Sequence, residues 1–182
     1  TRQHKLVDLE IEQQINTEIV GCIYKGVVKN IVPAVDGIFV DIGIGKNAFL
    51  RRKDLLNEKR FPTEGSPILA QVIKSDTDMK GALITEKISM FGKYAVTLSG
   101  TGYIGVSKKI RQESVRKRLK EIGKEICAEH MGLIIRTAAE NADMDEFRKD
   151  ITRLKENWDI IQKRFRMEKS PTLLYRESDI IV

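Results

Sequence analysis

A series of short β-type segments between residues 19 and 87 constrains the fold most strongly. The segments are Ile19–Val32, Ile38–Ile42, Ala48–Leu50, Ile68–Ile73 and Ala82–Ile88. Turn-forming sequences separate them, including Val35-Asp36-Gly37, the glycine-containing stretch Gly43–Asn47 and the polar loop Asp76–Gly81. Short strands at this spacing, over about seventy residues, suit a small β-barrel better than a sandwich.

Beyond residue 87 the pattern becomes mixed. The strands expected here are Tyr94–Leu98, Tyr103–Val106, Met131–Arg136 and Thr172–Tyr175, with further short strands at Leu6–Ile15 and Ser178–Val182 near the ends. The first two are predicted to pair as a hairpin across residues 99–102. Glu113–Lys124 has the composition of a short basic helix. We therefore expect an α+β protein.

The clearest single element is a helix from about Met144 to Phe165. Its apolar residues recur at spacings of three and four and form one stripe: Met144, Phe147, Ile151, Leu154, Trp158, Ile161 and Phe165. Asp143, with Glu146 three residues later, predicts a capping pair at its start. Heptad spacing also occurs in coiled coils, but such a stripe more often packs on a sheet, and we expect that arrangement.

Charge is distributed unevenly along the chain. The net charge is +6, from 32 Lys and Arg against 26 Asp and Glu. The first eighteen residues are acidic and the rest of the chain is basic, which suggests a polyanionic partner. Solvated surface lysines would give the same charge, so charge alone leaves the two interpretations balanced.

Other features disfavour several classes of protein. The sequence has no apolar run of 18 residues, so no membrane span is expected. Its opening residues mix charged and apolar types and do not resemble a signal peptide. Cys22, Cys127, His4 and His130 show no CxxC or metal-ligand spacing, so neither a zinc site nor a disulfide framework is expected. A reducing cytoplasm fits this composition.

Alternation within two barrel segments places aromatic rings on the outer face. The aliphatic residues of Ile38–Ile42 face inward, so Phe39 faces outward, and Phe49 faces outward between Ala48 and Leu50. Such rings suit single-stranded RNA, because bases stack on them with about 1–3 kcal/mol each while cations neutralise phosphates. The alternative is that one or both rings cover a hydrophobic edge.

The stretch Ile135–Glu140 is the most informative one for an anion site. A strand ends at Arg136, and Thr137 with Glu140 matches a capping box, so a helical turn is expected to start there. A helix start offers free N–H groups and a positive dipole end, and a neighbouring guanidinium can hold a phosphate with two hydrogen bonds. A surface arginine beside an ordinary cap is the alternative.

Other polar stretches are less specific. The basic residues of Lys108–Arg111 and Arg116–Arg118 form either a solvated helix face or a phosphate-backbone contact. Gly43–Asn47 lacks the spacing of a phosphate-binding loop, so a hairpin turn is expected there. Asp41 and Asp54 are expected to be structural, and no nucleophile–base arrangement stands out.

Several motifs together resemble the ribonuclease E/G family of bacterial endoribonucleases. They are Glu18–Val28, Ala34–Leu50, Lys80–Thr85, Gly105–Ile110, Met131–Ala139 and Leu173–Asp179. The resemblance covers nearly the whole chain, in order. An isolated barrel of the ribosomal S1 type would share only its middle third.

The resemblance implies a domain order. Residues 1–18 correspond to the start of an RNase H-like region, 19–87 to an inserted S1-type OB-fold RNA-binding barrel, 88–176 to a 5′ sensor region, and 177–182 to the start of the resumed RNase H-like region. In the family a DNase I-like domain follows, with paired aspartates that hold Mg²⁺, and then a cysteine pair that links subunits through Zn²⁺. Neither has a counterpart here, so this chain is expected to be inactive alone.

The resemblance also implies roles for individual residues. It assigns RNA binding to Phe39, Phe49, Lys80, Lys108 and Lys109, and 5′-phosphate binding to Gly92, Val96, Arg136 and Thr137. Lys108 and Lys109 stand where arginines are usual, which keeps the charge but weakens two-pronged contacts. The loop between Asp54 and Gly65 is also shorter than in common members.

By this resemblance we expect the RNA-binding and 5′-monophosphate-sensing part of a cytoplasmic, single-strand-specific endoribonuclease for RNA processing and mRNA decay. The full-length protein is expected to use Mg²⁺ and Zn²⁺ and to form homo-oligomers. The runner-up is a non-catalytic single-stranded RNA-binding protein that uses the barrel alone. A third hypothesis is a scaffold that docks through the Met144–Phe165 helix. The Arg136-Thr137 motif argues against both alternatives.

Overall fold

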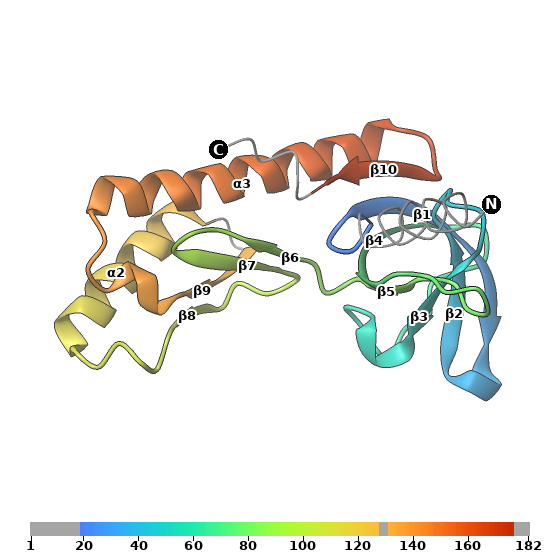
Figure 1. Cartoon of the computed structure of the whole chain (residues 1–182), viewed down its shortest axis with the longest axis horizontal. Coiled ribbons are helices and arrows are strands. Elements are labelled where there is room, and N and C mark those ends of the chain that lie inside the picture. The colour runs from blue at the N-terminus through green and yellow to red at the C-terminus, as the bar shows by residue number, and fades with distance from the viewer. Residues whose placement is uncertain (1–18, 128–130, 177–182) are drawn as a thin grey trace, which may run out of the picture. The chain divides into compact units, whose positions relative to one another are not determined.

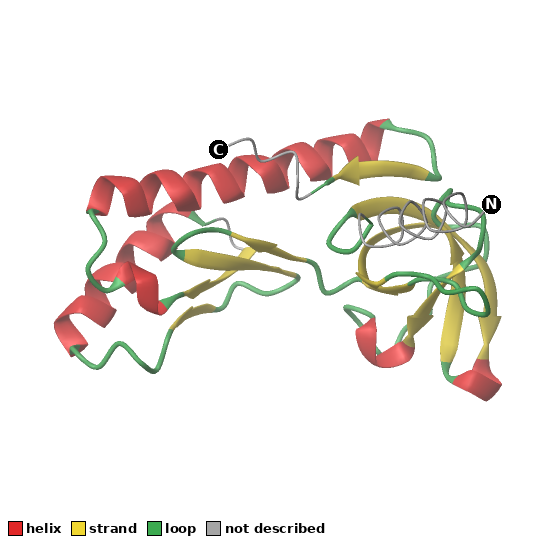
Figure 2. Cartoon of the chain, in the orientation of Figure 1, coloured by secondary structure: helices red, strands yellow, loops and turns green. Residues whose placement is uncertain are grey.

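The computed structural model describes residues 19–127 and 131–176 (Figure 1). These residues form two compact units: a barrel unit of residues 19–86 and 167–176, and a second unit of residues 87–166. Figure 2 shows strands in both units and the two longer helices, one before and one after the last strand of the second sheet. The α+β class is confirmed. The strands expected at Leu6–Ile15 and Ser178–Val182, and the histidines His4 and His130, lie outside the described residues.

The barrel unit contains the predicted five-stranded barrel. Its strands are β1 (Ile23–Val32), β2 (Gly37–Asp41), β3 (Ala48–Arg51), β4 (Pro67–Lys74) and β5 (Leu83–Thr85). They follow the order β1-β2-β3-β5-β4, and pairing between β1 and β4 closes the ring. The strand predicted from Ala82 to Ile88 is shorter than expected, because β5 ends at Thr85 and the next strand, in the second unit, begins only at Ser89.

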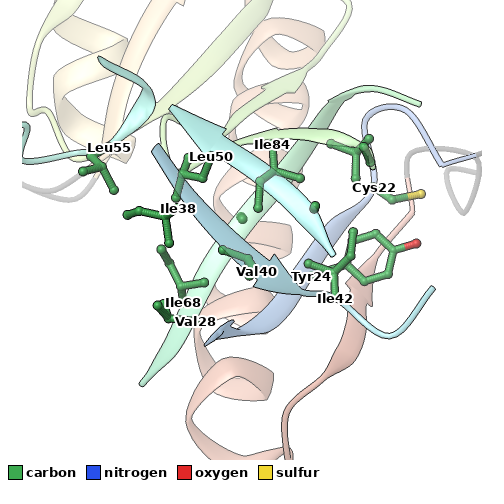
Figure 3. Close-up of a cluster of buried hydrophobic side chains, with 14 residues drawn as sticks. Cys22, Tyr24, Val28, Ile38, Val40, Ile42, Leu50, Leu55, Ile68 and Ile84 are labelled. Atoms are coloured by element: carbon green, nitrogen blue, oxygen red, sulfur yellow. The ribbon is translucent and has the colours of Figure 1, made fainter. Parts of the chain in front are cut away.

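Strict alternation fills the barrel with aliphatic side chains. Ile38, Val40, Ala48 and Leu50 are fully buried, together with Ile84 from β5 (Figure 3). The residues between them, Phe39 and Phe49, therefore project from the outer face.

The chain returns to the barrel unit after the second unit. Strand β10 (Thr172–Tyr175) has the predicted bounds and pairs antiparallel with β1, with Tyr24 opposite Leu173. The Lys25 ammonium donates a hydrogen bond of 2.6 Å to the carbonyl of Glu168 just before this strand. Residues separated by more than a hundred positions thus complete one β-sheet.

The second unit is built on a four-stranded sheet. Its strands are β6 (Ser89–Phe91), β7 (Ala95–Ser99), β8 (Ile104–Val106) and β9 (Met131–Ile135), in the order β6-β7-β9-β8. The predicted hairpin between Tyr94–Leu98 and Tyr103–Val106 is wrong, because β9 lies between them and pairs parallel with β8. The reason is that the nearly continuous apolar run of β9 suits a central strand with a neighbour on each side.

Two helices complete the second unit. They are α2 (Glu113–Ile126) and α3 (Met144–Met167), and both predicted helices are confirmed. Asp143 caps α3, since its carboxylate accepts the N–H groups of Asp145 at 2.9 Å and Glu146 at 3.2 Å. Glu146 does not complete the capping box, because its carboxylate accepts the Tyr94 hydroxyl instead.

Much of the apolar stripe of α3 is buried. Phe147, Ile151, Leu154 and Ile161 are fully buried, and the Phe147 ring meets the Tyr94 ring edge-on at 6.3 Å between centroids. This agrees with packing against a sheet rather than a coiled coil. In the part of the chain that the structure describes, no helix has both the length and the apolar character needed to cross a membrane.

Candidate nucleic-acid interface

Phe39 and Phe49 form a cross-strand pair on the outside of the barrel. They lie directly opposite each other on β2 and β3, with ring centroids 5.4 Å apart, and both are half-buried. The Phe49 ring also lies over Gly37, where an added Cβ would come within 2.3 Å of it. The glycine therefore leaves space for the ring, and the outward placement predicted by alternation is confirmed.

A groove of about 600 Å³ opens beside the two rings. It is lined by Val35, Phe39, Phe49, Lys74, Ser75, Thr77, Met79, Lys80, Gly81 and Leu83. Lys80 thus lies at the same groove as the aromatic pair, and Lys74 adds a second cation that the sequence analysis missed. The Ser75 hydroxyl is buried and has no hydrogen-bond partner among the described residues.

The loop between β4 and β5 places Lys80 at the groove. Thr77 and Lys80 exchange backbone hydrogen bonds of 2.8 and 3.2 Å, which closes a tight turn. The Lys46 ammonium, from the β2–β3 hairpin, donates to the carbonyls of Thr77 at 2.9 Å and Asp78 at 3.1 Å. Gly43–Asn47 is therefore a hairpin turn, as predicted, and it anchors the loop that carries Lys80.

Arg136 and Gly92 lie together in the second unit. The Arg136 guanidinium donates to the Gly92 carbonyl at 2.8 Å and to the Lys93 carbonyl at 3.5 Å, and the residue is exposed. The segment 92–95 forms a tight turn in which Gly92 donates to the carbonyl of Ala95 at 2.8 Å. Two of the four residues expected at the phosphate site are thus in direct contact.

Thr137 does not cap a helix in the predicted way. A single 3-10 turn, Thr137–Ala139, follows Arg136, and no side-chain capping bond is formed. The Thr137 hydroxyl instead lies 3.1 Å from the Ser107 hydroxyl, so the predicted capping box with Glu140 is wrong. Ser107, which directly follows the neighbouring strand β8, supplies the partner of the Thr137 hydroxyl instead.

The Ser107–Thr137 contact joins the start of the basic stretch, Lys108 and Lys109, to the turn that follows Arg136. Both lysines are exposed, and the Lys109 N–H donates to the Ser107 hydroxyl at 3.3 Å. Arg116, from the same basic stretch, points inward and donates to the carbonyls of Ser107 at 2.6 Å and Ile110 at 2.9 Å. The basic stretch is therefore divided between exposed cations and one structural arginine.

Asp150 is a site-forming residue that the sequence analysis missed. It is buried on α3, and its carboxylate accepts the N–H groups of Tyr94 at 2.8 Å and Lys93 at 3.2 Å and the Arg153 guanidinium at 3.0 Å. A Cβ on Gly92 would approach this carboxylate to 2.5 Å. The sequence offered one indication of this role: Asp150 lies three residues after Phe147, so the helix places this acidic residue beside the apolar stripe.

A second acid of α3 holds the other side of the same turn. Glu146 accepts the Tyr94 hydroxyl and pairs with the Lys93 ammonium at 3.2 Å. Hydrogen bonds from Tyr94 and then Lys93 lower the pKa of Glu146, and hydrogen bonds with Tyr94 and then Glu146 raise the pKa of Lys93. The Glu146 carboxylate therefore balances part of the Lys93 charge, whereas the Arg136 guanidinium donates to backbone carbonyls of the same turn.

No metal centre is formed by the residues that the structure describes. Within 19–127 and 131–176, no three His, Cys, Asp or Glu side chains are grouped as metal ligands. Asp41 pairs with Lys29 at 3.4 Å, and Asp54 pairs with Arg51, so both have the structural roles predicted for them. Burial raises the pKa of the Cys127 thiol to about 11, which disfavours the thiolate that metal binding requires.

Comparisons with known proteins identify the family. The profile of the Ribonuclease E/G family matches residues 89–182, and that of the S1 RNA binding domain matches residues 18–85. Ribonuclease G of Escherichia coli (strain K12) is 35% identical over 189 residues, which cover 94% of this chain and 39% of that protein. Ribonuclease E of Synechocystis sp. is 34% identical over 182 residues, covering 94% of this chain and 27% of the relative.

The chain belongs to the ribonuclease E/G family. Ribonuclease G of Haemophilus influenzae gives the same result, with 34% identity over 94% of this chain and 38% of the relative. The chain thus spans well under half the length of these relatives.

Proposed function

We propose that this chain is the RNA-binding and 5′-monophosphate-sensing part of a single-strand-specific endoribonuclease that acts in RNA processing and decay. The observation that carries the proposal is the barrel groove, where Phe39 and Phe49 lie beside Lys80. In this assignment residues 19–87 are the RNA-binding barrel and 88–176 the 5′ sensor. Residues 1–18 and 177–182 belong to an RNase H-like region.

The groove has the chemistry that single-stranded RNA requires. Bases have two flat faces, and half-buried rings on the outer face of a barrel can stack with them whatever the sequence. Lys74 and Lys80 at the same groove provide charge for the phosphates. The match to the S1 RNA binding domain covers all of these residues.

The second unit supports recognition of a terminal phosphate. The exposed Arg136 guanidinium follows the end of β9 directly, beside the Gly92 turn and the first N–H groups of the 3-10 turn. Arginine and free backbone N–H groups are common phosphate ligands. The Thr137 hydroxyl and the nearby Lys108 and Lys109 add polar and cationic groups, and the family resemblance gives the anion as an RNA 5′ end.

The alternatives have less support. A protein that used the barrel alone would leave the Arg136 turn and its supports, Asp150 and Glu146, without a role. A scaffold that docked through α3 would need its apolar stripe free, and most of that stripe is buried. We further propose that the full-length protein is cytoplasmic and homo-oligomeric, with Mg²⁺ for catalysis and Zn²⁺ between subunits, as the family resemblance implies.

The chain is expected to bind single-stranded RNA without cutting it. Binding should weaken steeply with salt, because phosphate contacts release counterions. A labelled RNA incubated with the purified chain and Mg²⁺ should remain intact while a shift assay shows a complex. Mg²⁺-dependent cleavage that persisted through repurification would contradict this expectation.

Arg136→Ala is expected to remove a preference for 5′-monophosphorylated RNA. Loss of a charge-assisted contact costs about 1.5–3 kcal/mol, or roughly 10- to 150-fold in affinity. The measurement compares one short RNA carrying a 5′-monophosphate, 5′-hydroxyl or 5′-triphosphate. Affinity for the 5′-hydroxyl RNA should be unchanged, and Arg136→Lys should restore the preference only in part, because an ammonium lacks the two-pronged geometry.

Arg148→Ala is the matched control, since it removes an arginine from α3 whose guanidinium already pairs with Glu125. It should leave the preference intact. If Arg136→Ala weakened all three RNAs equally, Arg136 would be a general backbone contact and the sensor assignment would be wrong.

A further inference from the structure

One face of the four-stranded sheet in the second unit is open. Along each strand the side chains alternate, and Met90, Ala95, Leu133 and Ile135 are buried on the side that carries the helices (Figure 1). The opposite side carries Phe91, which is 52% exposed, and Ile134, which is 39% exposed. This side we name the open face.

A single apolar row crosses the open face. Phe91 on β6 lies opposite Val96 on β7, Val96 lies opposite Ile134 on β9, and Ile134 lies beside Gly105 on β8. Neighbouring strands are about 4.8 Å apart, so the row spans roughly 14 Å. That length accommodates two or three stacked nucleobases, as on other four-stranded RNA-binding sheets.

A second aromatic ring ends the row at the other edge. Tyr103 is 64% exposed, and its ring lies over Gly105, where an added Cβ would come within 2.8 Å of it. Glycine at this position therefore leaves space for the ring over β8, and Gly105 itself pairs with Ile134 on β9. An exposed ring stands at each end of the row, and aliphatic side chains lie between them.

We propose that the open face is a base-stacking platform for single-stranded RNA, on which Phe91 and Tyr103 stack with the nucleotides that follow a bound 5′ end. The inference rests on the proposed RNA-binding function and extends it to Phe91 and Tyr103, which lie outside the groove and are not among the residues assigned to 5′-phosphate binding. Arg136 is two residues beyond Ile134, or roughly 7 Å along a strand. An RNA held at Arg136 would thus reach the row within about one nucleotide.

Charge favours RNA over a protein as the occupant. The open-face positions of the four strands carry no acidic residue: they are Ser89, Phe91, Val96, Leu98, Gly105, Gly132 and Ile134. The exposed cations Arg136, Lys108 and Lys109 follow directly on β9 and β8. An uncharged apolar row with cations at the strand ends matches the stacked bases and phosphates of a single strand.

The test is a thermodynamic cycle in which an aromatic ring is removed from the protein, bases are removed from the RNA, and both changes are combined. A 5′-monophosphorylated pentanucleotide is compared with the same RNA made abasic at nucleotides 2 to 4. Phe91→Ala and Tyr103→Ala should each weaken binding of the intact RNA about 5-fold or more, the value of one stack. Both variants should bind the abasic RNA as the unmodified chain does.

Ile160→Ala, which removes a 55% exposed side chain from α3, is the matched control and should leave the affinity for both RNAs unchanged.

The proposal is overturned if the ring variants bind both RNAs as the unmodified chain does, or weaken both equally. If the variants instead shift the chain from dimer to monomer in sedimentation without changing RNA affinity, the face is a protein interface. If the ring variants do not selectively weaken binding of the intact RNA, while the 5′-monophosphate preference is present, only the platform proposal is refuted. Absence of any RNA binding by the unmodified chain refutes the proposed function as well.

Discussion

Phe39→Ala and Phe49→Ala combined are expected to weaken single-stranded RNA binding by roughly 2–6 kcal/mol, because each base stacked on a ring contributes about 1–3 kcal/mol. The two rings are 5.4 Å apart and line one groove, so the single effects need not add. The measurement is the affinity for a fixed RNA at one salt concentration, for both single variants and the double variant.

Leu56→Ala is the control for this prediction. Leu56 is an exposed aliphatic side chain of the barrel unit that does not line the groove, and its removal should leave affinity unchanged. Thermal stability is recorded in parallel. A contrary result would be that the phenylalanine variants lose much thermal stability while their folded fraction binds RNA with unchanged affinity. That result would mean that the rings stabilise the barrel and do not bind RNA.

Asp150→Ala is expected to destabilise the second unit by about 3 kcal/mol. Its carboxylate accepts the N–H groups of Lys93 and Tyr94, and each buried donor left without a partner costs about 1–3 kcal/mol. The turn that carries Gly92 should loosen as well, so any 5′-monophosphate preference should fall with stability. Denaturant unfolding measures the first effect.

Asp159→Ala provides the comparison on the same helix. Asp159 is exposed and pairs with Lys155 four residues earlier, an interaction worth about 0.3–0.5 kcal/mol. An Asp150→Ala variant that unfolded at the same denaturant concentration as Asp159→Ala would show that the buried carboxylate does not support the turn.

Elements whose apolar residues recur at a regular spacing were predictable from the sequence. Alternation in β2 and β3 fixed which side chains fill the barrel, and the same alternation put Phe39 and Phe49 outside. The stripe of α3 was equally clear, because its apolar residues recur over more than six turns. In both cases a local pattern corresponds directly to a buried face.

Features that depend on distant partners were not predictable in this way. Nothing local shows that β9 separates β7 from β8, because Met131–Ile135 lies 25 residues after Val106 in the chain. Thr137 matches a capping box by spacing, yet its hydroxyl contacts Ser107 on another strand end. Asp150 resembles any helix acid until its backbone partners, more than fifty residues earlier, are in place.

The candidate site shows the same division. The aromatic pair followed from alternation, whereas Lys80 was assigned only through the family resemblance, since its place at the groove depends on the loop that Lys46 anchors. Phe91 and Tyr103 were not noticed at all. Their common row becomes visible only when the register of all four strands is known.

The most direct test of the whole account is the affinity of the unmodified chain for one short single-stranded RNA with either a 5′-monophosphate or a 5′-hydroxyl. The exposed Arg136 guanidinium beside the Gly92 turn predicts tighter binding of the monophosphorylated RNA, by about 10-fold or more. Equal affinities for the two RNAs would contradict the account.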